Sequence, residues 1–200
     1  MKAAGQDVDR EKVRWRRSAV AACRPRHLQC GMATPRHPQT LLICTSVHHG
    51  NTAAVARAMA GVLGAEVAAP EAVPYTIVHE HDLLGFGSGV YYGRMHRALF
   101  TWLRGLPDAT EPSRPAFVFS TSGLPFLAKA WHAPLASLLR RKGFDVVGEF
   151  ACRGFDSWGP LWFVGGLNRR HPDERDLARA GEFARRLEAS LPAERRRRAT

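Results

Sequence analysis

Three short apolar segments, each followed at once by a polar loop that contains glycine, constrain this chain more than any other feature. The segments span residues 40–45, 82–87 and 115–120. Apolar runs of this length between turn residues are typical of buried strands. Packing of a buried core does not explain why polar loops recur at these points. Binding of a ligand by backbone amides and hydroxyl groups does explain it. The pattern therefore predicts a binding site built at the ends of strands.

Segments with helical spacing of apolar residues lie between the predicted strands, and this alternation predicts an α/β fold. We expect further strands at 65–68 and 144–152, and helices at 51–63, at 127–139, at 172–191 and through Met95, Leu99, Leu103 and Leu106. Short apolar strands that alternate with helices favour a three-layer α/β/α sandwich around a five-stranded parallel sheet. In such folds, ligands bind beyond the carboxyl ends of the strands, which is where the polar loops lie.

The strongly basic composition belongs mainly to the two ends of the chain. The 200 residues carry a formal net charge of +11. Residues 1–38 hold nine Lys or Arg against three Asp or Glu, and residues 192–200 hold four Arg against one Glu. We predict a basic, disordered N-terminal extension (1–38), one nearly neutral domain (39–191) and an Arg-rich tail (192–200). A start at Met32 instead of Met1 stays an open alternative.

Several common classes of protein are excluded by what the sequence lacks. No apolar run approaches the roughly 18 residues of a membrane-spanning helix, and the four cysteines form no CxxC pair. The first polar loop has no Gly-Lys-Ser/Thr, and Gly85-x-Gly87 is followed by Val90 where a dinucleotide fingerprint needs Gly or Ala. Neither Ser88 nor Ser122 has the flanking glycines of a nucleophile elbow. Free, buried thiols favour a cytoplasmic protein.

The loop between residues 45 and 52 is the most informative of the three. It contains Thr45, Ser46, His48, Gly50, Asn51 and Thr52 and leads directly into a predicted helix. Unpaired amides and the positive end of the dipole make a helix N-terminus suited to phosphate, and hydroxyl and amide groups add donors. The alternative is that Asn51 or Thr52 only caps the helix. The residues by themselves leave both interpretations open.

With these loops in view, residues 40–190 resemble the flavodoxin-like FMN-binding proteins. The resemblance is carried by Thr45-Ser46-Val47-His48-His49-Gly50-Asn51-Thr52, by Gly85-Phe86-Gly87-Ser88-Gly89-Val90-Tyr91-Tyr92-Gly93 and by Ser120-Thr121-Ser122-Gly123. It implies FMN as the cofactor and the strand order 2-1-3-4-5. In the family, the first loop is one residue shorter and lacks the pair His48-His49.

The resemblance also implies roles for individual residues. The FMN phosphate would be held in the first loop, which Thr45 opens, by Ser46, His48, Gly50, Asn51 and Thr52. One side of the flavin ring would be bordered by Ser88, Gly89, Val90, Tyr91 and Tyr92, and the other by Thr121, Ser122 and Gly123. Tyr91 or Tyr92 is a candidate for stacking on the ring, and loop packing is the alternative for both.

The implied function is electron transfer, or reduction of a small acceptor such as a quinone. The partner would be a redox protein or that small molecule, and the missing dinucleotide fingerprint favours a carrier over an NAD(P)H-dependent reductase. Many members of the family are strongly acidic, but this domain is not, so the resemblance implies no particular partner. Two other classes stay open: a flavin-free interaction module, and a protein whose basic tails bind nucleic acid or anionic surfaces. Nucleic-acid binding through the folded domain is not expected.

The remaining polar clusters favour structural roles. His79-Glu80-His81 is expected at the surface, and no metal site is predicted. Cys152 is expected to pack in the core, although it ends a predicted strand and so lies near the ligand edge. His171 is expected to support the start of the last helix, and the apolar segment 158–168 to close the core.

Overall fold

The fold is built on a parallel sheet whose strand order matches the predicted one. The computed structural model describes residues 38–47, 50–108, 113–154 and 171–191, so residues 1–37 of the predicted extension, the Arg-rich tail and the segment 158–168 lie outside them. The five parallel strands follow the order β2 (Glu66–Ala68), β1 (Thr40–Thr45), β3 (Leu83–Tyr91), β5 (Arg114–Ser122) and β6 (Phe144–Arg153). With numbering by parallel strands alone, this is the expected order 2-1-3-4-5.

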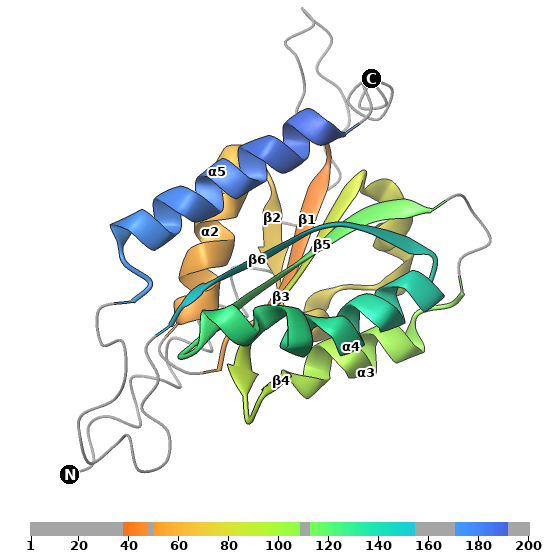
Figure 1. Ribbon diagram of the computed structural model, residues 1–200. Coiled ribbons are helices and arrows are strands. Elements are labelled where there is room, and N and C mark those ends of the chain that lie inside the picture. The colour runs from red at the N-terminus through yellow and green to blue at the C-terminus, as the bar shows by residue number, and fades with distance from the viewer. Residues whose placement is uncertain (1–37, 48–49, 109–112, 155–170, 192–200) are drawn as a thin grey trace, which may run out of the picture.

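Helices cover both faces of the sheet and complete the three-layer sandwich (Figure 1). On one face lie α2 (Asn51–Leu63) and α5 (Glu174–Ser190), and on the other lie α3 (Arg97–Gly105) and α4 (Ala128–Arg141). Three 3₁₀ turns lie in the connections: η1 (Pro70–Ala72), η2 (Tyr75–Glu80) and η3 (Pro125–Leu127). Among the described residues, every helix is too short or too polar to cross a bilayer.

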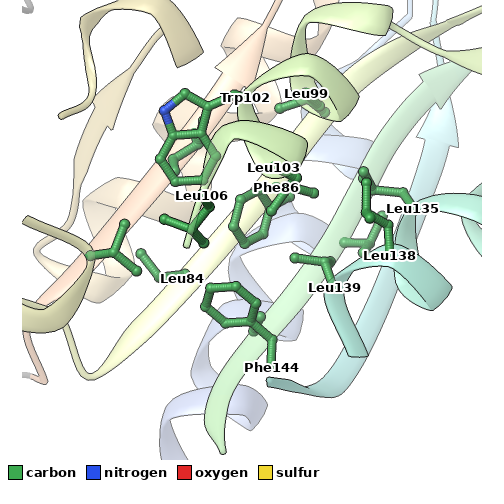
Figure 2. Close-up of a cluster of buried hydrophobic side chains, with 14 of the residues drawn as sticks. Leu84, Phe86, Leu99, Trp102, Leu103, Leu106, Leu135, Leu138, Leu139 and Phe144 are labelled. Carbon is green, nitrogen blue, oxygen red and sulfur yellow. The ribbon is translucent and has the colours of Figure 1, made fainter. Parts of the chain in front are cut away.

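The sheet separates two apolar cores because successive residues of a strand point to opposite faces. Under α3 and α4, side chains such as Leu84 and Phe86 meet Leu99, Leu135 and Phe144 (Figure 2). Phe86 is fully buried, and burying a side chain of this size stabilises the fold by roughly 1.5–3 kcal/mol. The second core lies under α2 and α5. Two cores of this kind hold the strand ends in place from both sides.

The third strand is longer than its sequence predicts. It continues from residue 87 through Tyr91. Ser88 and Gly89 pair with the neighbouring parallel strands, and a short strand, β4 (Arg94–Met95), folds back and pairs antiparallel with the last two residues of β3. Tyr92 and Gly93 form the turn between them, with φ angles of 53° and 73°, as a two-residue hairpin requires. Ser88–Tyr91 was predicted as a loop and is strand, and Met95 lies before α3 rather than in it.

The strand β5 also extends further than predicted, through Ser122. Its neighbour β6 runs beside it to Arg153, and the register pairs Thr121 with Cys152 and Ser122 with Arg153. Thr121 and Ser122 are therefore held in the ladder, and only Gly123 of the three predicted binding residues here lies beyond the strand. The fold thus fixes the backbone at two of the predicted binding residues.

The start of the last helix is set by a capping box. The Asp173 side chain accepts a hydrogen bond from the Asp176 backbone N–H, and the Asp176 side chain accepts one from the Asp173 N–H. Pro172 was predicted in the first turn and instead precedes the cap. The His171 Nδ1 lies 2.6 Å from Asp176 Oδ2, so His171 does support the helix start as expected.

Candidate functional site

Three buried hydroxyl groups without a hydrogen-bond partner mark the carboxyl edge of the sheet. They are the side-chain oxygens of Thr45, Ser46 and Ser122, and none has a partner among the residues that the structure describes. Thr45 ends β1 and Ser122 ends β5, with only β3 between them. Two strand spacings correspond to roughly 10 Å. An unpaired buried hydroxyl costs about 1–3 kcal/mol, so three of them at one edge point to a polar ligand.

The first loop enters α2 through a glycine in the left-handed region. Gly50 has a φ of 66° and occupies the N-cap position, with no side-chain cap bond. Its carbonyl accepts from the Ala54 N–H at 2.9 Å. The cap role considered for Asn51 or Thr52 is therefore wrong, since Gly50 holds the N-cap position and Asn51 is already the first residue of the helix. His48 lies outside the described residues.

The start of α2 is tied to the end of β5 by a hydrogen bond between two threonines. Thr52 Oγ1 and Thr121 Oγ1 lie 2.8 Å apart, and both side chains are buried. Gly154 closes this region, because a Cβ there would lie 3.0 Å from Thr121 Cβ and 3.1 Å from Asn51 Nδ2. Two of the predicted loops thus meet in one place, with Gly154 packed against both of them.

The predicted residues of β3 take part in the fold rather than in an open loop. Ser88 is fully buried, and its hydroxyl donates to the Gly89 carbonyl at 2.8 Å and accepts from the His96 N–H at 2.9 Å. Gly89 pairs with Thr121, and Val90 pairs with Met95. The hydroxyl of Ser88 is thus engaged inside the protein and is not available to a ligand.

The two tyrosines that were candidates for stacking have different surroundings. The Val47 N–H donates to the Tyr91 hydroxyl at 3.3 Å, and the Tyr91 ring meets the His96 ring edge-on. Tyr91 therefore holds the first loop to the end of β3. Tyr92 is 75% exposed at the hairpin turn. The positive φ of Tyr92 is uncommon for a bulky residue and costs free energy. The hairpin turn thus holds the Tyr92 ring at the surface beside the site.

An exposed aromatic side chain next to the site was missed in the sequence. Phe126 lies in η3 directly after β5 and is 77% exposed. The helical spacing from Leu127 onward placed this residue just before a helix and assigned it no role. The signal was Leu124-Pro125-Phe126, since a proline after a polar loop favours a short 3₁₀ turn that projects the next side chain.

A polar chain behind the site, buried at His132 and Ser120, was also missed. His132 Nε2 lies 2.8 Å from Ser120 Oγ, and His132 Nδ1 lies 3.0 Å from Glu149 Oε2. Burial lowers the pKa of His132, and the hydrogen bond and charge of Glu149 oppose that shift. With Glu149 accepting at Nδ1, the neutral ring accepts from the Ser120 hydroxyl at Nε2. Ser120 is fully buried, so this chain organises β5 and offers no accessible nucleophile.

The other sequence candidates take structural roles in the described residues. His79 and Glu80 are exposed, and the His81 ring bonds the Ile77 carbonyl at 2.8 Å. Cys152 belongs to the core under α2 and α5. Burial, together with the nearby Asp176 charge, raises the pKa of its thiol to about 12. Burial raises the pKa of the Cys44 thiol to about 12 as well, so both thiols are inert packing groups.

A curated relative places the chain in a family. An uncharacterised protein of Methanocaldococcus jannaschii is 38% identical over 149 residues, which cover 74% of this chain and 97% of the relative. Solved structures with the same three-layer architecture are flavodoxins and flavodoxin-like proteins. The chain belongs to the same family as this archaeal protein, and its fold is flavodoxin-like. No known family model matches its sequence.

The flavodoxin-like fold is shared with proteins of low sequence identity. Flavodoxin 1 of Bacillus cereus superposes with a TM-score of 0.57 at 19% identity, over 77% of this chain and all of its own (100%). An archaeal flavodoxin gives a TM-score of 0.56 at 16% identity, over 76% and 96% of the two chains. The general stress protein 14 of Treponema denticola, solved in complex with FMN, gives 0.50 at 13% identity over 76% and 97%.

Proposed function

We propose that this protein binds FMN at the carboxyl ends of β1, β3 and β5 and works in electron transfer. The observation that carries the proposal is the set of three buried hydroxyls, Thr45, Ser46 and Ser122, that have no partner among the described residues. A hydroxyl buried without a partner is rare in a folded protein. A ligand with phosphate, ribityl and amide oxygens supplies partners to all three.

The first loop suits the phosphate of that ligand. Gly50 has no Cβ, so its left-handed backbone lets the loop approach a phosphate closely. The amides that follow belong to the first turn of α2, which is 13 residues long and has no acidic residue in that turn. Its dipole therefore favours an anion there. Ser46 adds a hydroxyl donor, and Thr52 is held in place by its bond to Thr121.

We assign the ring of the ligand to the region beyond the carboxyl ends of β3 and β5. The backbone at Ser88–Tyr91 borders it on one side, and Thr121, Ser122 and Gly123 border it on the other. Tyr92, exposed at the hairpin turn, is the candidate for stacking. When bound, FMN supplies the redox chemistry, while the protein binds and orients the ring and limits its contact with water.

A spectrum of the purified full chain tests the proposal. We expect absorbance between about 350 and 500 nm after purification, or after titration of the flavin-free protein with FMN. Addition of NADH or NADPH then distinguishes an electron carrier from a reductase. The flavin of a carrier stays oxidised. The flavin of a reductase that acts on a small acceptor such as a quinone is reduced and loses its colour. Absence of colour together with absence of FMN uptake would refute the proposal and leave a flavin-free interaction module.

A further inference from the structure

The two helical layers of the domain differ sharply in charge. The exposed helices α3 and α4 carry five Arg or Lys and no Asp or Glu, whereas α2 and α5 carry five Arg and four acidic residues. Residues 83–107 and 113–144 contain no acidic residue at all. The domain as a whole is nearly neutral, because most of the net charge lies at the ends of the chain. The uneven distribution of charge between its two helical layers becomes visible once each helix is assigned to a face of the sheet.

We define the cationic face as the exposed basic side chains of β4, α3 and α4: Arg94, Arg97, Arg104, Lys129, Arg140 and Arg141. Among the described residues, no ion pair involves any of the six. Arg104 lies over the Phe100 ring and Arg141 bonds the Ser137 hydroxyl, so these two are oriented but not neutralised. Even with the exposed carboxylates of Asp108 and Glu149 on the same side, the six cations give this face a net positive charge and a positive field.

Exposed apolar side chains adjoin this face at the proposed flavin site. We call them the apolar rim: Tyr92, Leu124, Phe126 and Leu127, which are 75%, 45%, 77% and 40% exposed. The hairpin turn contacts the first turns of α4, because a Cβ on Gly93 would lie 3.4 Å from Trp131 Nε1. A cluster of exposed apolar residues bordered by charges is typical of a protein-binding surface.

We infer that this surface docks an acidic redox protein, with the apolar rim at the centre of contact and the cationic face steering the encounter. The inference rests on the proposed function, since an electron-transfer partner must approach the flavin site. Charge complementarity selects a negatively charged protein and disfavours a basic one. Aliphatic Leu124 and Leu127 in the rim favour a folded protein over a single-stranded nucleic acid, whose bases stack on aromatic rings.

Charge reversal on this face, compared with a matched reversal elsewhere, tests the inference. Arg97 and Lys129 lie in the first turns of their helices, where a carboxylate suits the helix dipole. The variant R97E/K129E is therefore expected to fold normally and to keep its flavin content. The control is R175E/R185E, which changes the charge equally on two exposed residues of α5. The full chain is used throughout, so both variants keep the same tails.

The probe is an oxidised, acidic [2Fe–2S] ferredoxin, and binding is measured by titration calorimetry at low and moderate salt. We expect salt-sensitive binding that R97E/K129E weakens at least tenfold and the control changes less than twofold. F126A should weaken binding without changing its salt dependence. Basic cytochrome c should not bind. Flavin content is measured separately by absorbance, so loss of the flavin and loss of docking are distinguished.

Three results would overturn the inference. They are no binding of the ferredoxin by the wild-type chain, an equal effect of both charge-reversal variants, and tighter binding of a 30-nucleotide single strand that R97E/K129E abolishes. The second result would assign binding to charges outside this face. The third would assign the face to nucleic acid.

Discussion

Thr52 Oγ1 lies 2.8 Å from Thr121 Oγ1 and joins the first turn of α2 to the last residues of β5. The two residues are 69 positions apart in the chain, and both belong to the loops that the sequence assigned to ligand binding. The bond fixes the distance between the proposed phosphate and ring subsites before a ligand arrives. Preorganisation of this kind reduces the ordering cost of binding.

A double-mutant cycle tests this link. Thr52→Val and Thr121→Val are each expected to destabilise the flavin-free protein by about 1–2 kcal/mol, because each leaves the other hydroxyl buried and unpaired. The double variant should cost less than the sum of the two, since neither hydroxyl then remains. Chemical denaturation measures these differences. Strict additivity would show that the contact contributes nothing.

The partnerless hydroxyls predict opposite effects on stability and on ligand affinity. Ser46→Ala and Ser122→Ala are expected to leave the flavin-free protein as stable as before, or up to about 1 kcal/mol more stable, because an unpaired buried hydroxyl is removed. The Kd for FMN should rise about tenfold for Ser46→Ala, which loses a bond to a charged phosphate, and about fivefold for Ser122→Ala.

Fluorescence titration with FMN and chemical denaturation provide the two readouts for these serine variants. Ser137→Ala serves as the control, because Ser137 is exposed on α4 away from the strand ends. A loss of stability without a change in Kd would assign Ser46 and Ser122 to the fold alone.

The buried histidine predicts a pH dependence of stability. Burial lowers the pKa of His132 below its usual 6.5, so the unfolded chain takes up the proton first as the pH falls. The free energy of unfolding should therefore decrease as the pH drops below about 6.5 and continue to decrease until the folded-state pKa is reached. Denaturant unfolding between pH 8 and pH 5 measures this slope.

Two variants isolate the contribution of His132 to that slope. His132→Gln should flatten it, because no titrating group remains at this position. Glu149→Gln should steepen it, since the carboxylate that favours the protonated ring is removed. An unchanged slope in both variants would show that other groups control the acid dependence.

Two glycines with different surroundings give a steric test. Gly154→Ala places a Cβ 3.0 Å from Thr121 Cβ and 3.1 Å from Asn51 Nδ2, so it should displace both residues and weaken FMN binding several-fold. Gly61→Ala meets no atom within 4 Å and lies inside α2, so it should stabilise the fold by about 0.5–1 kcal/mol without changing the Kd. Equal Kd values for the two variants would argue against a site beside Gly154.

Local sequence patterns were sufficient to predict the five parallel strands and the helices, whereas the strand order was implied by the family resemblance and β4 was not predicted. The segments 40–45 and 51–63 match β1 and α2 residue for residue. A short apolar run indicates a buried strand, and apolar residues at three- and four-residue steps indicate a helix with one buried face. The polar residues after the strands marked the correct edge of the sheet, since parallel strands end on the same side. The carboxyl ends of β3 and β5 were predicted too early, because the residues that extend them pair with neighbouring strands of the sheet and, at the end of β3, with β4.

Which of the candidate side chains are available to a ligand was decided only by the tertiary structure. Ser88 and Ser122 look alike in the sequence, yet Ser88 bonds the His96 amide and Ser122 has no partner in the described part of the chain. The charge asymmetry between the helical faces depended equally on which helices share a side. Composition and periodicity carry information about neighbours in the chain, whereas hydrogen bonds and surface charge depend on residues that only folding brings together.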